Sequence, residues 1–318
     1  MHRKFLYMAL GILAAATLGC KKDEDNTTIN PSLYGAAFNI VPFGAVGESF
    51  TLTPTGDIYA TDGTDIKESE VGYYWMVNSG KKDTVDKFVF TPDALGDYTI
   101  LLGVFSKTGA YYNATTTHTI SIIDPSLGKS LSGTGILPDD DHITDKGVDY
   151  YYMSIGGDQW FRNNLADPDL GLYYYNAAVT GAVLGKYYTW DEAVTACPDG
   201  WSLPSADQWQ SLVDAFDGEA GALMADAWFN DTRMWSYWPT LQTEQESGFA
   251  ALSSGYIQLL GSDRKFQGIY HYAAFWTGTE SKEDTGQAIY YYLNENQRRV
   301  YSHSADKKSM ALSVRCVR

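Results

Sequence analysis

The chain contains only three cysteines, and their positions constrain its fold more than any other feature. Cys20 follows a basic start and an apolar run, residues 5–19. This run is too short to span a bilayer, which needs roughly 20 residues, but it has the length of an export signal. In an exported chain, the two remaining thiols, Cys197 and Cys316, predict one disulfide. It would close a loop of about 120 residues and stabilise the fold by about 4–5 kcal/mol in the chain-entropy account.

The residues around Cys20 also indicate where the protein resides. Thr17-Leu18-Gly19-Cys20 resembles the lipobox of bacterial lipoproteins, in which the cysteine is lipidated and becomes the new N-terminus. Residues 21–25, Lys-Lys-Asp-Glu-Asp, resemble the export tag of surface lipoproteins in Bacteroidetes-type bacteria. We therefore expect residues 1–19 to be a lipoprotein signal peptide. Residues 20–32 are then a disordered tether to the outer membrane, with the protein exposed at the cell surface. An ordinary signal peptide that happens to precede a cysteine is the alternative.

The charge balance excludes two classes of partner. The chain carries 39 acidic and 23 basic side chains, a formal net charge of −16. Nucleic-acid binding rests on Lys and Arg that neutralise phosphates, and docking on anionic lipid needs a basic patch, so we expect neither. Contact with the membrane is expected through the N-terminal lipid alone. With 318 residues, of which 44% are hydrophobic, the chain is long and apolar enough for two packed domains.

Residues 33–124 have the composition of a β-sandwich. Short segments rich in Val, Ile, Thr, Phe and Tyr alternate with Gly, Pro, Asp and Asn. Trp75 lies where a sandwich buries a tryptophan, and residues 96–100, Gly-Asp-Tyr-Thr-Ile, match the tyrosine corner that begins a later strand. These motifs resemble PKD-type immunoglobulin-like domains, which implies an immunoglobulin-like β-sandwich. We expect this domain to be a spacer, followed by a linker over residues 125–140.

The C-terminal half contains two helix starts with a clear physical basis. Thr189 is followed by acids in the first turn, and Ser205 is followed three residues later by Gln208, which forms a capping box. These signals predict one helix that ends at Cys197 and another that begins after Ser205. The last residues, 312–318, have the pattern of a strand.

An ordered set of motifs in residues 141–318 resembles the Fibrobacter succinogenes major paralogous domain. The motifs fall, in order, at Asp145, Ile155–Trp160 with Asn164-Leu165, Cys197–Pro204, Gly248-Phe249, Phe275-Trp276 and Ser313–Cys316. The resemblance implies a C-type-lectin-like α+β domain, with two helices against small twisted sheets and with the first and last strands paired. It also implies that the disulfide joins the end of the first helix to the last strand. The chain as a whole is thus expected to be an all-β domain followed by an α+β domain.

The sequence favours aromatic and amide side chains as ligand contacts. The motifs that bind calcium in lectins, Glu-Pro-Asn, Gln-Pro-Asp and Trp-Asn-Asp, are absent from the sequence, and residues 228–231 match the last only with an inserted Phe. Sugar rings stack on Trp and Tyr and accept hydrogen bonds from amides and guanidinium groups. The predicted ligand-binding residues follow the second helix or lie in late strands: Trp235, Tyr237, Trp238, Arg264, Tyr270, Tyr291, Asn294 and Asn296. For any single Trp, packing in the core is the alternative.

The sequence offers no catalytic or metal-binding constellation. No histidine after the signal has the spacing of a metal-ligand pair with another His or Cys: His118, His142, His271 and His303. A nucleotide-binding loop and a serine nucleophile motif are also absent. Acids in the first domain, which could be considered for calcium, have the pattern of solvated loop residues: Asp65, Glu68 and Glu70. We therefore predict that the protein is not an enzyme and uses no metal or cofactor.

These observations lead to two functional hypotheses. The first is a surface lipoprotein whose C-terminal domain binds a glycan or a surface protein without calcium. The second is a structural or assembly component, such as an accessory subunit of an outer-membrane complex or a fimbria. A ligand-binding domain should expose an aromatic-lined surface, whereas an assembly component should expose a flat apolar patch or a free strand edge.

Overall fold

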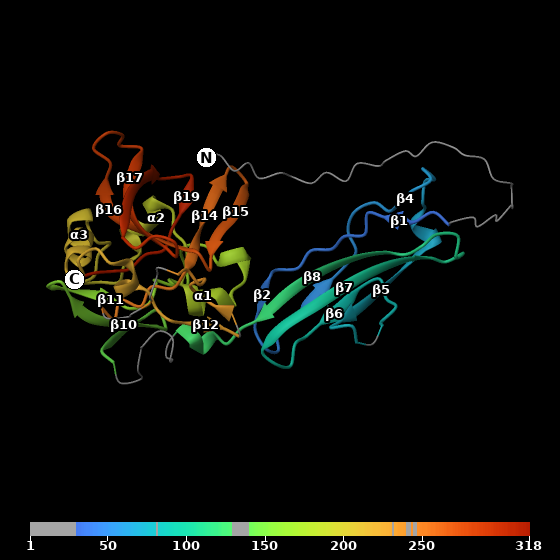
Figure 1. Ribbon diagram of the computed structural model, residues 1–318, viewed down its shortest axis with the longest axis horizontal. Coiled ribbons are helices and arrows are strands. Elements are labelled where there is room, and N and C mark those ends of the chain that lie inside the picture. Colours follow the sequence, from blue (N-terminus) through green and yellow to red (C-terminus); the bar gives the residue numbers. More distant parts are fainter. Residues whose placement is uncertain (1–29, 81, 129–139, 231, 240–242, 244–246) are drawn as a thin grey trace.

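The computed structural model describes residues 30–80, 82–128, 140–230, 232–239, 243 and 247–318 (Figure 1). The fold is mostly β, and it has two lobes along the longest axis of the molecule (Figure 1). The N-terminal lobe consists mainly of strands, and the α-helices lie in the C-terminal lobe. The predicted signal peptide, the lipidation at Cys20 and most of the predicted tether lie outside the described residues, as do residues 129–139 of the predicted linker.

The N-terminal lobe is built from three small sheets. Its four-stranded sheet has the order β2 (Phe43–Gly44), β8 (Ala114–Ile122), β7 (Gly96–Ser106) and β5 (Val71–Val77). The two-stranded sheets are β3 (Phe50–Leu52) with β6 (Phe88–Phe90), and β1 (Leu33–Tyr34) with β4 (Tyr59–Ala60). A 3₁₀ helix, η1 (Glu68–Glu70), precedes β5.

Side chains from the four-stranded sheet and from the β3–β6 sheet share one core. Trp75 of β5 is fully buried, and its indole N–H donates to the carbonyl of Val85 at 3.2 Å. The hydroxyl of Tyr98, at the start of β7, donates to the carbonyl of Ala94 at 3.1 Å. The predictions of a buried strand tryptophan and of a tyrosine corner are therefore confirmed. Each large apolar side chain buried in this way stabilises the fold by about 1.5–3 kcal/mol.

The C-terminal lobe contains one large sheet and two small ones. The large sheet runs β15 (Asp263–Ile269), β14 (Ser254–Leu260), β16 (Tyr272–Glu280), β17 (Gln287–Asn294) and β18 (Tyr301–Asp306), and β19 (Met310–Ala311) also pairs with β14. The small sheets are β11 (Asp158–Phe161), β10 (Val148–Ile155) and β9 (His142–Asp145), and the pair β12 (Trp228–Phe229) and β13 (Thr232–Arg233).

Four α-helices pack around these sheets: α1 (Val179–Leu184), α2 (Trp190–Ala196), α3 (Ala206–Asp214) and α4 (Ala220–Leu223). The two predicted helices are confirmed as α2 and α3, and both begin with a complete capping box. In α3 the N–H of Gln208 donates to the hydroxyl of Ser205 at 3.1 Å, and the N–H of Ser205 donates to the side chain of Gln208 at 3.0 Å. Short 3₁₀ helices, η2 (Pro125–Gly128) and η3 (Tyr174–Asn176), lie near α1.

The last residues of the chain are bonded to two early elements of the C-terminal lobe, α2 and β11. Cys197, which caps the end of α2, forms a disulfide with Cys316, and their Cα atoms are 5.8 Å apart. The predicted disulfide is confirmed. Beside it, the backbone of Arg318 pairs with that of Gln159 in β11, with N–H to carbonyl distances of 2.8 and 3.0 Å in the two directions. The last segment is therefore paired with β11, an early strand of the lobe, but residues 312–318 form isolated bridges rather than the strand that the sequence predicted.

The two lobes share a small apolar core. Phe43 of β2 and Ile123, which follows β8, are buried in the same cluster as Tyr174, Ala177 and residues of α1. The sequence predicted a linker from residue 125 onward, but the structure places η2 at its start, against α1. The reason is that apolar side chains of both lobes are buried together next to this segment. The start of the predicted linker is therefore part of the packed contact between the lobes.

Candidate functional site

Two of the predicted ligand-binding residues are buried. Trp235 is only 1% exposed, and its indole N–H donates to the carbonyl of Ala251 at 2.9 Å. Tyr291 is 6% exposed, and its ring stacks on Trp209 of α3 with the centroids 5.2 Å apart. The prediction is wrong for both, because their apolar rings are worth more in the core than on the surface.

The error at Tyr291 has a simple cause. Successive side chains of a strand point to opposite faces, so Tyr291 cannot share a face with Asn294, although both were predicted as ligand contacts. In β17 the residues that share a face with Asn294 are Tyr290 and Tyr292. Applied strictly, the alternation in the sequence would have selected these two tyrosines instead.

The other predicted residues are accessible, and backbone hydrogen bonds bring three of their segments together: Ser236 donates to Tyr270, and Glu295 donates to His271. Tyr237 and Trp238 are 77% and 43% exposed, in the segment after β13. Half-buried Tyr270 accepts a hydrogen bond at its carbonyl from the N–H of Ser236. The Arg264 guanidinium of β15 donates to the side chain of Asn176 at 3.1 Å. Asn294 and Asn296 form the turn after β17, in which the Asn296 N–H donates to the Asn294 side chain at 3.1 Å.

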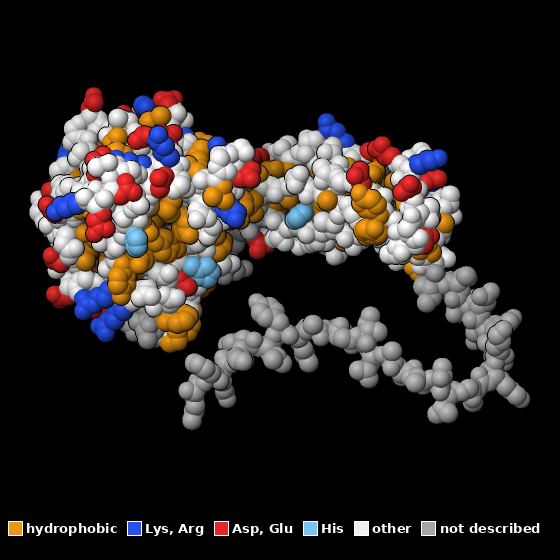
Figure 2. Space-filling view, turned by 90° about the horizontal axis from the view of Figure 1, so that it is seen from above, with side chains coloured by type: hydrophobic (Ala, Val, Ile, Leu, Met, Phe, Trp, Pro, Cys, Tyr) orange, Lys and Arg blue, Asp and Glu red, His pale blue; other side chains and the backbone are white. Residues whose placement is uncertain are grey.

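The large sheet brings together a set of tyrosines that the sequence did not single out. We call this set the tyrosine surface: Tyr256 of β14, Tyr272 of β16, Tyr290 and Tyr292 of β17, and Tyr301 of β18. All five side chains are partly or largely accessible, and Tyr301 is 42% exposed. Figure 2, in which tyrosine is coloured with the hydrophobic residues, shows such side chains gathered across the C-terminal lobe, beside histidine side chains.

Strand register explains why these rings meet. Tyr292 lies opposite Tyr301 in β18, and Tyr290 lies opposite His303. Tyr272 lies at the start of β16, opposite Asn294, and its ring is stacked on that of Tyr292 with the centroids 5.1 Å apart. Further ring pairs extend the set to both sides: Tyr256 with Tyr272 at 5.4 Å and Tyr292 with Tyr301 at 5.8 Å. The rings form one connected row across four strands.

The rings of the stacked pairs stand on edge rather than lying flat, whereas Tyr256 meets Tyr272 edge to face at 63°. Centroids 5.1 Å apart with planes inclined by only 24° require the two rings of Tyr272 and Tyr292 to overlap, since flat rings side by side would collide at that distance. Their faces are therefore turned toward each other, and ring edges face outward. This arrangement leaves an open ring face mainly at the end of the row, on Tyr301.

Hydroxyl and amide groups connect the row. The Tyr256 hydroxyl donates to the side chain of Gln267 at 3.2 Å, and Gln267 donates to Gln258 at 2.8 Å. The Tyr272 hydroxyl donates to that of Tyr290. Burial raises the pKa of both Tyr272 and Tyr290 above the ordinary value, so both hydroxyls stay neutral donors at physiological pH.

Charges near the tyrosine surface are paired at its two ends. At one end the ring of His271 lies 3.1 Å from a carboxylate oxygen of Glu295. At the other, Lys307 forms an ion pair with Glu280 and lies over the ring of Trp190, 4.0 Å from its centroid. Between these two ends the surface presents mainly tyrosine rings and hydroxyls, with His303 beside Tyr290.

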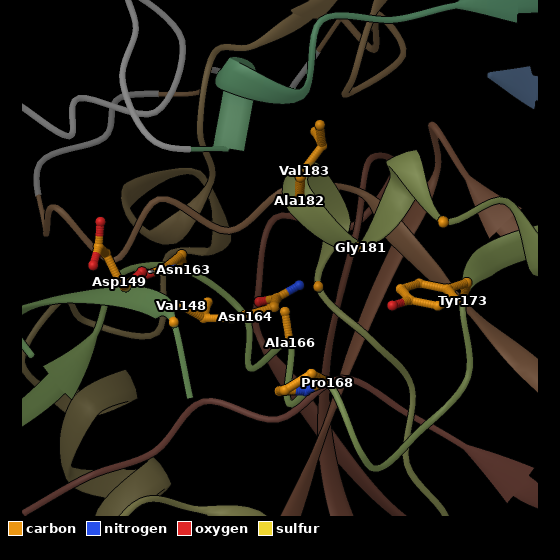
Figure 3. A pocket seen from close by; sticks show the side chains of 13 residues that line it. Val148, Asp149, Asn163, Asn164, Ala166, Pro168, Tyr173, Gly181, Ala182 and Val183 are labelled. Carbon is orange, nitrogen blue, oxygen red and sulfur yellow. Dashed lines mark hydrogen bonds between the residues drawn. The ribbon is translucent and has the colours of Figure 1, made fainter. Parts of the chain in front are cut away.

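A separate cavity of about 280 Å³ lies between β10 and α1 (Figure 3). Tyr173 stands on one side of it and Asn163 and Asn164 on the other (Figure 3). Both amides are engaged with the backbone: Asn164 donates to the Leu184 carbonyl at 2.7 Å, and Asn163 accepts from the Tyr151 N–H at 3.0 Å. Because these amides hold the fold, the tyrosine surface is the stronger candidate site.

Within the described residues, no group of three or more His, Cys, Asp or Glu side chains is arranged to hold a metal ion. In the same part of the chain, no helix is both long and apolar enough to cross a membrane.

Comparison with known proteins identifies the C-terminal lobe. The family model described as the Fibrobacter succinogenes major domain matches residues 153–318. No curated protein matches the chain. Among solved structures, the PKD1 domain of the Vibrio cholerae metalloprotease PrtV is 18% identical, with 30% of this chain and 98% of that chain covered and a TM-score of 0.20. The Yersinia pseudotuberculosis adhesin InvE is 12% identical, with 91% and 70% covered and a TM-score of 0.24. These two likenesses are too weak to carry an argument.

Proposed function

The chain belongs to the Fibrobacter succinogenes major domain family, and from this premise we propose that it is a surface-anchored binding protein. Its C-terminal domain binds an uncharged glycan or protein ligand through the tyrosine surface, without calcium. The N-terminal domain, an immunoglobulin-like sandwich of the PKD type, is the spacer. A lipid on Cys20 holds the protein to the outer membrane, with both domains outside the cell.

Three features support a C-type-lectin-like architecture for the C-terminal domain. Helices α2 and α3 pack against the large sheet, through contacts with β16. The disulfide from Cys197 to Cys316 joins the end of α2 to the last segment. The first and last segments pair through Gln159 and Arg318. A fold of this kind does not by itself define a ligand, so the function rests on the surface chemistry.

The observation that carries the proposal is the pre-ordered row of accessible tyrosines. Immobilising a flexible side chain on binding costs about 0.5–1.5 kcal/mol, and rings already stacked on one another avoid most of that cost. Tyrosine offers a large apolar ring and a hydroxyl at low entropic cost, which is why it dominates many binding surfaces. The paired charges at the ends leave the centre without an ionic contact. Binding should therefore depend little on salt.

The orientation of the rings bears on the kind of ligand. A sugar ring stacks on an exposed aromatic face, and in the row such a face is open mainly at Tyr301. A protein surface, by contrast, packs readily against ring edges and accepts hydrogen bonds from a line of hydroxyls. The geometry therefore favours a protein, or a glycan that contacts Tyr301 and the row of hydroxyls along its length.

Binding by soluble variants tests the proposal. Residues 21–318 are assayed on a glycan array and against extracellular proteins, in EDTA and at two salt concentrations. We expect Tyr292→Ala and Tyr301→Ala to weaken binding at least about tenfold, since aromatic contacts at the centre of an interface often contribute 2 kcal/mol or more. EDTA should have no effect.

Two variants serve as controls. Tyr112→Ala removes an exposed ring from the N-terminal lobe and should leave both affinity and melting temperature unchanged. Tyr237→Ala removes the most exposed aromatic of the segment that the sequence favoured. If Tyr237→Ala abolishes binding and Tyr301→Ala does not, the site is the segment after β13, and the proposal fails.

A further inference from the structure

We infer that two copies of this chain pair antiparallel through the outer edge of β18, so that their large sheets join into one. This inference goes beyond the proposed function, because it needs no ligand.

The outer edge of β18 is open over Ser302–Asp306. β18 is the last strand in the order of the large sheet, so one of its edges faces β17 and the other faces outward. Just before β18, the outward edge is occupied: the N–H of Val300 donates to the carbonyl of Gly218 at 3.1 Å. Because backbone groups alternate sides along a strand, the outward groups after Val300 belong to Ser302, Ser304 and Asp306. No described strand pairs with them.

The composition of the two edge strands differs. At the opposite edge of the sheet, β15 begins Asp263-Arg264-Lys265, and such charges protect an edge from pairing with another chain. In β18, residues 301–306 are Tyr-Ser-His-Ser-Ala-Asp, with one charged residue, Asp306, at the end of the strand and no Lys or Pro. The edge formed by β15 therefore begins with three charged residues, whereas the edge formed by β18 is less protected against pairing with another chain.

The open edge is complementary to itself. With a two-fold axis at Ser304, Ser304 faces Ser304 of the second copy, and Ser302 faces Asp306 of the second copy. These three outward pairs exchange about six backbone hydrogen bonds. On the tyrosine side, His303 lies opposite the small side chain of Ala305, so no like charges or bulky groups meet. Such symmetric pairing is the commonest route to a closed dimer.

Two contacts of the single chain must be replaced, since the Nδ1 atom of His303 also lies 2.8 Å from the carbonyl oxygen of Ser304. The outward N–H of Ser304 donates to the Nδ1 atom of His303 at 2.7 Å. In the dimer this N–H donates instead to the Ser304 carbonyl of the second copy. Because the free stretch is only five residues long and Gly218 limits it at one end, the interface is small, and we expect a weak dimer.

The pairing has a consequence for binding. A two-fold axis perpendicular to a continuous sheet keeps the same face of both copies on the same side. Two tyrosine surfaces would then lie next to each other, with Tyr301 of each copy near the joint. A ligand with repeated epitopes would gain avidity from this arrangement.

Oxidative cross-linking tests the register directly. Residues that exchange both hydrogen bonds of an antiparallel pair have Cα atoms about 5.5 Å apart, within the range of a disulfide. Ser304→Cys should therefore form a covalent dimer under mild oxidation, whereas Ser262→Cys, exposed in the turn between β14 and β15, should not. Equal cross-linking of the two variants, or none in Ser304→Cys, would overturn the inference.

Sedimentation equilibrium of residues 21–318 provides the second readout. Protein concentrations from about 10 to 500 µM suit the weak dimer that a small interface would give. The wild-type chain should dimerise with concentration. Ser304→Pro, which removes the outward N–H at a position where edge strands tolerate proline, should weaken dimerisation at least about tenfold. Ser304→Lys retains the N–H but places two like charges at the axis, and should do the same, unlike Ser262→Lys. A chain that stays monomeric throughout, or a dimer that both Ser304 variants retain, contradicts the inference.

Discussion

Arg315 has an unusual environment for a charged side chain. It is 1% exposed, and its guanidinium donates to the side chain of Asn164 and to the carbonyls of Phe161, Phe249 and Ala250. Burial, together with the nearby Arg162, lowers its pKa to about 9. The guanidinium also lies over the ring of Phe249, 4.5 Å from its centroid. Acceptors from two separate segments are thus satisfied by one side chain, which lies between the buried residues Val314 and Cys316.

Replacing Arg315 should therefore be costly. Arg315→Met keeps much of the volume but leaves buried acceptors without a donor, and we expect a loss of about 3–5 kcal/mol in the free energy of unfolding. Urea denaturation monitored by tryptophan fluorescence measures it. Arg264→Met, which removes an exposed guanidinium with one side-chain hydrogen bond, should change stability by less than about 0.5 kcal/mol. Similar losses for both variants would show that the Arg315 contacts are not needed.

Among the connecting segments, the turn at residues 167–170 is stabilised by the carboxylate of Asp167 and the ammonium of Lys186. The Asp167 side chain accepts from the N–H groups of Asp169 and Leu170 at 2.8 and 3.1 Å and pairs with Lys146 at 2.8 Å. The buried ammonium of Lys186 donates to the carbonyls of Asp167 and Leu170 at 2.7 and 2.8 Å. These bonds hold the turn that connects β11 to η3.

The pKa of Asp167 makes this turn sensitive to acid. Burial alone would raise that pKa, but the hydrogen bonds from Lys146 and from the two amides outweigh burial, and the net shift is downward. A lowered pKa in the folded state contributes stability above the unfolded value of about 3.9 and loses it as the pH falls through the folded value. We expect wild type to lose more unfolding free energy than Asp167→Asn between pH 5 and pH 2. Parallel pH profiles for the two proteins would refute this.

The elements also show what the sequence could and could not predict. Helices α2 and α3 were predictable because their signals are local: each carries its own capping box. Helix α1 was missed, since it has no capping side chain and almost all of it is buried, so tertiary packing forms it. The same limit applies to η2, which packs against α1 within the predicted linker.

The candidate site was predictable only in part. The sequence predicted aromatic ligand contacts in the late strands, and the structure brings a row of partly accessible tyrosines together there. Alternation from Asn294 selects Tyr290 and Tyr292 as the residues of β17 on the same face, whereas their pairing with Tyr301 and His303 depends on strand register. Tyr256 and Tyr272 join the row because β14 and β16 pair in parallel, at Gly255 and Ala273, a long-range contact without a local signal.

At the scale of the whole molecule, the two lobes are joined rather than loosely linked. Phe43 and Ile123 of the N-terminal lobe are buried with Tyr174 and Val183 of the C-terminal lobe. A joint of this kind holds the C-terminal domain in one orientation relative to the spacer. With the proposed lipid anchor at Cys20, the joint would fix the orientation of the tyrosine surface relative to the N-terminal lobe, while the predicted tether would leave its distance from the membrane variable.

Residue-resolved labelling of tyrosines with and without bound ligand tests the central claim most directly. We expect bound ligand to protect Tyr292 and Tyr301 from nitration, as measured by mass spectrometry. Tyr34 and Tyr112 of the N-terminal lobe should react equally with and without ligand. Unchanged labelling of Tyr292 and Tyr301 together with protection of Tyr237 would contradict it.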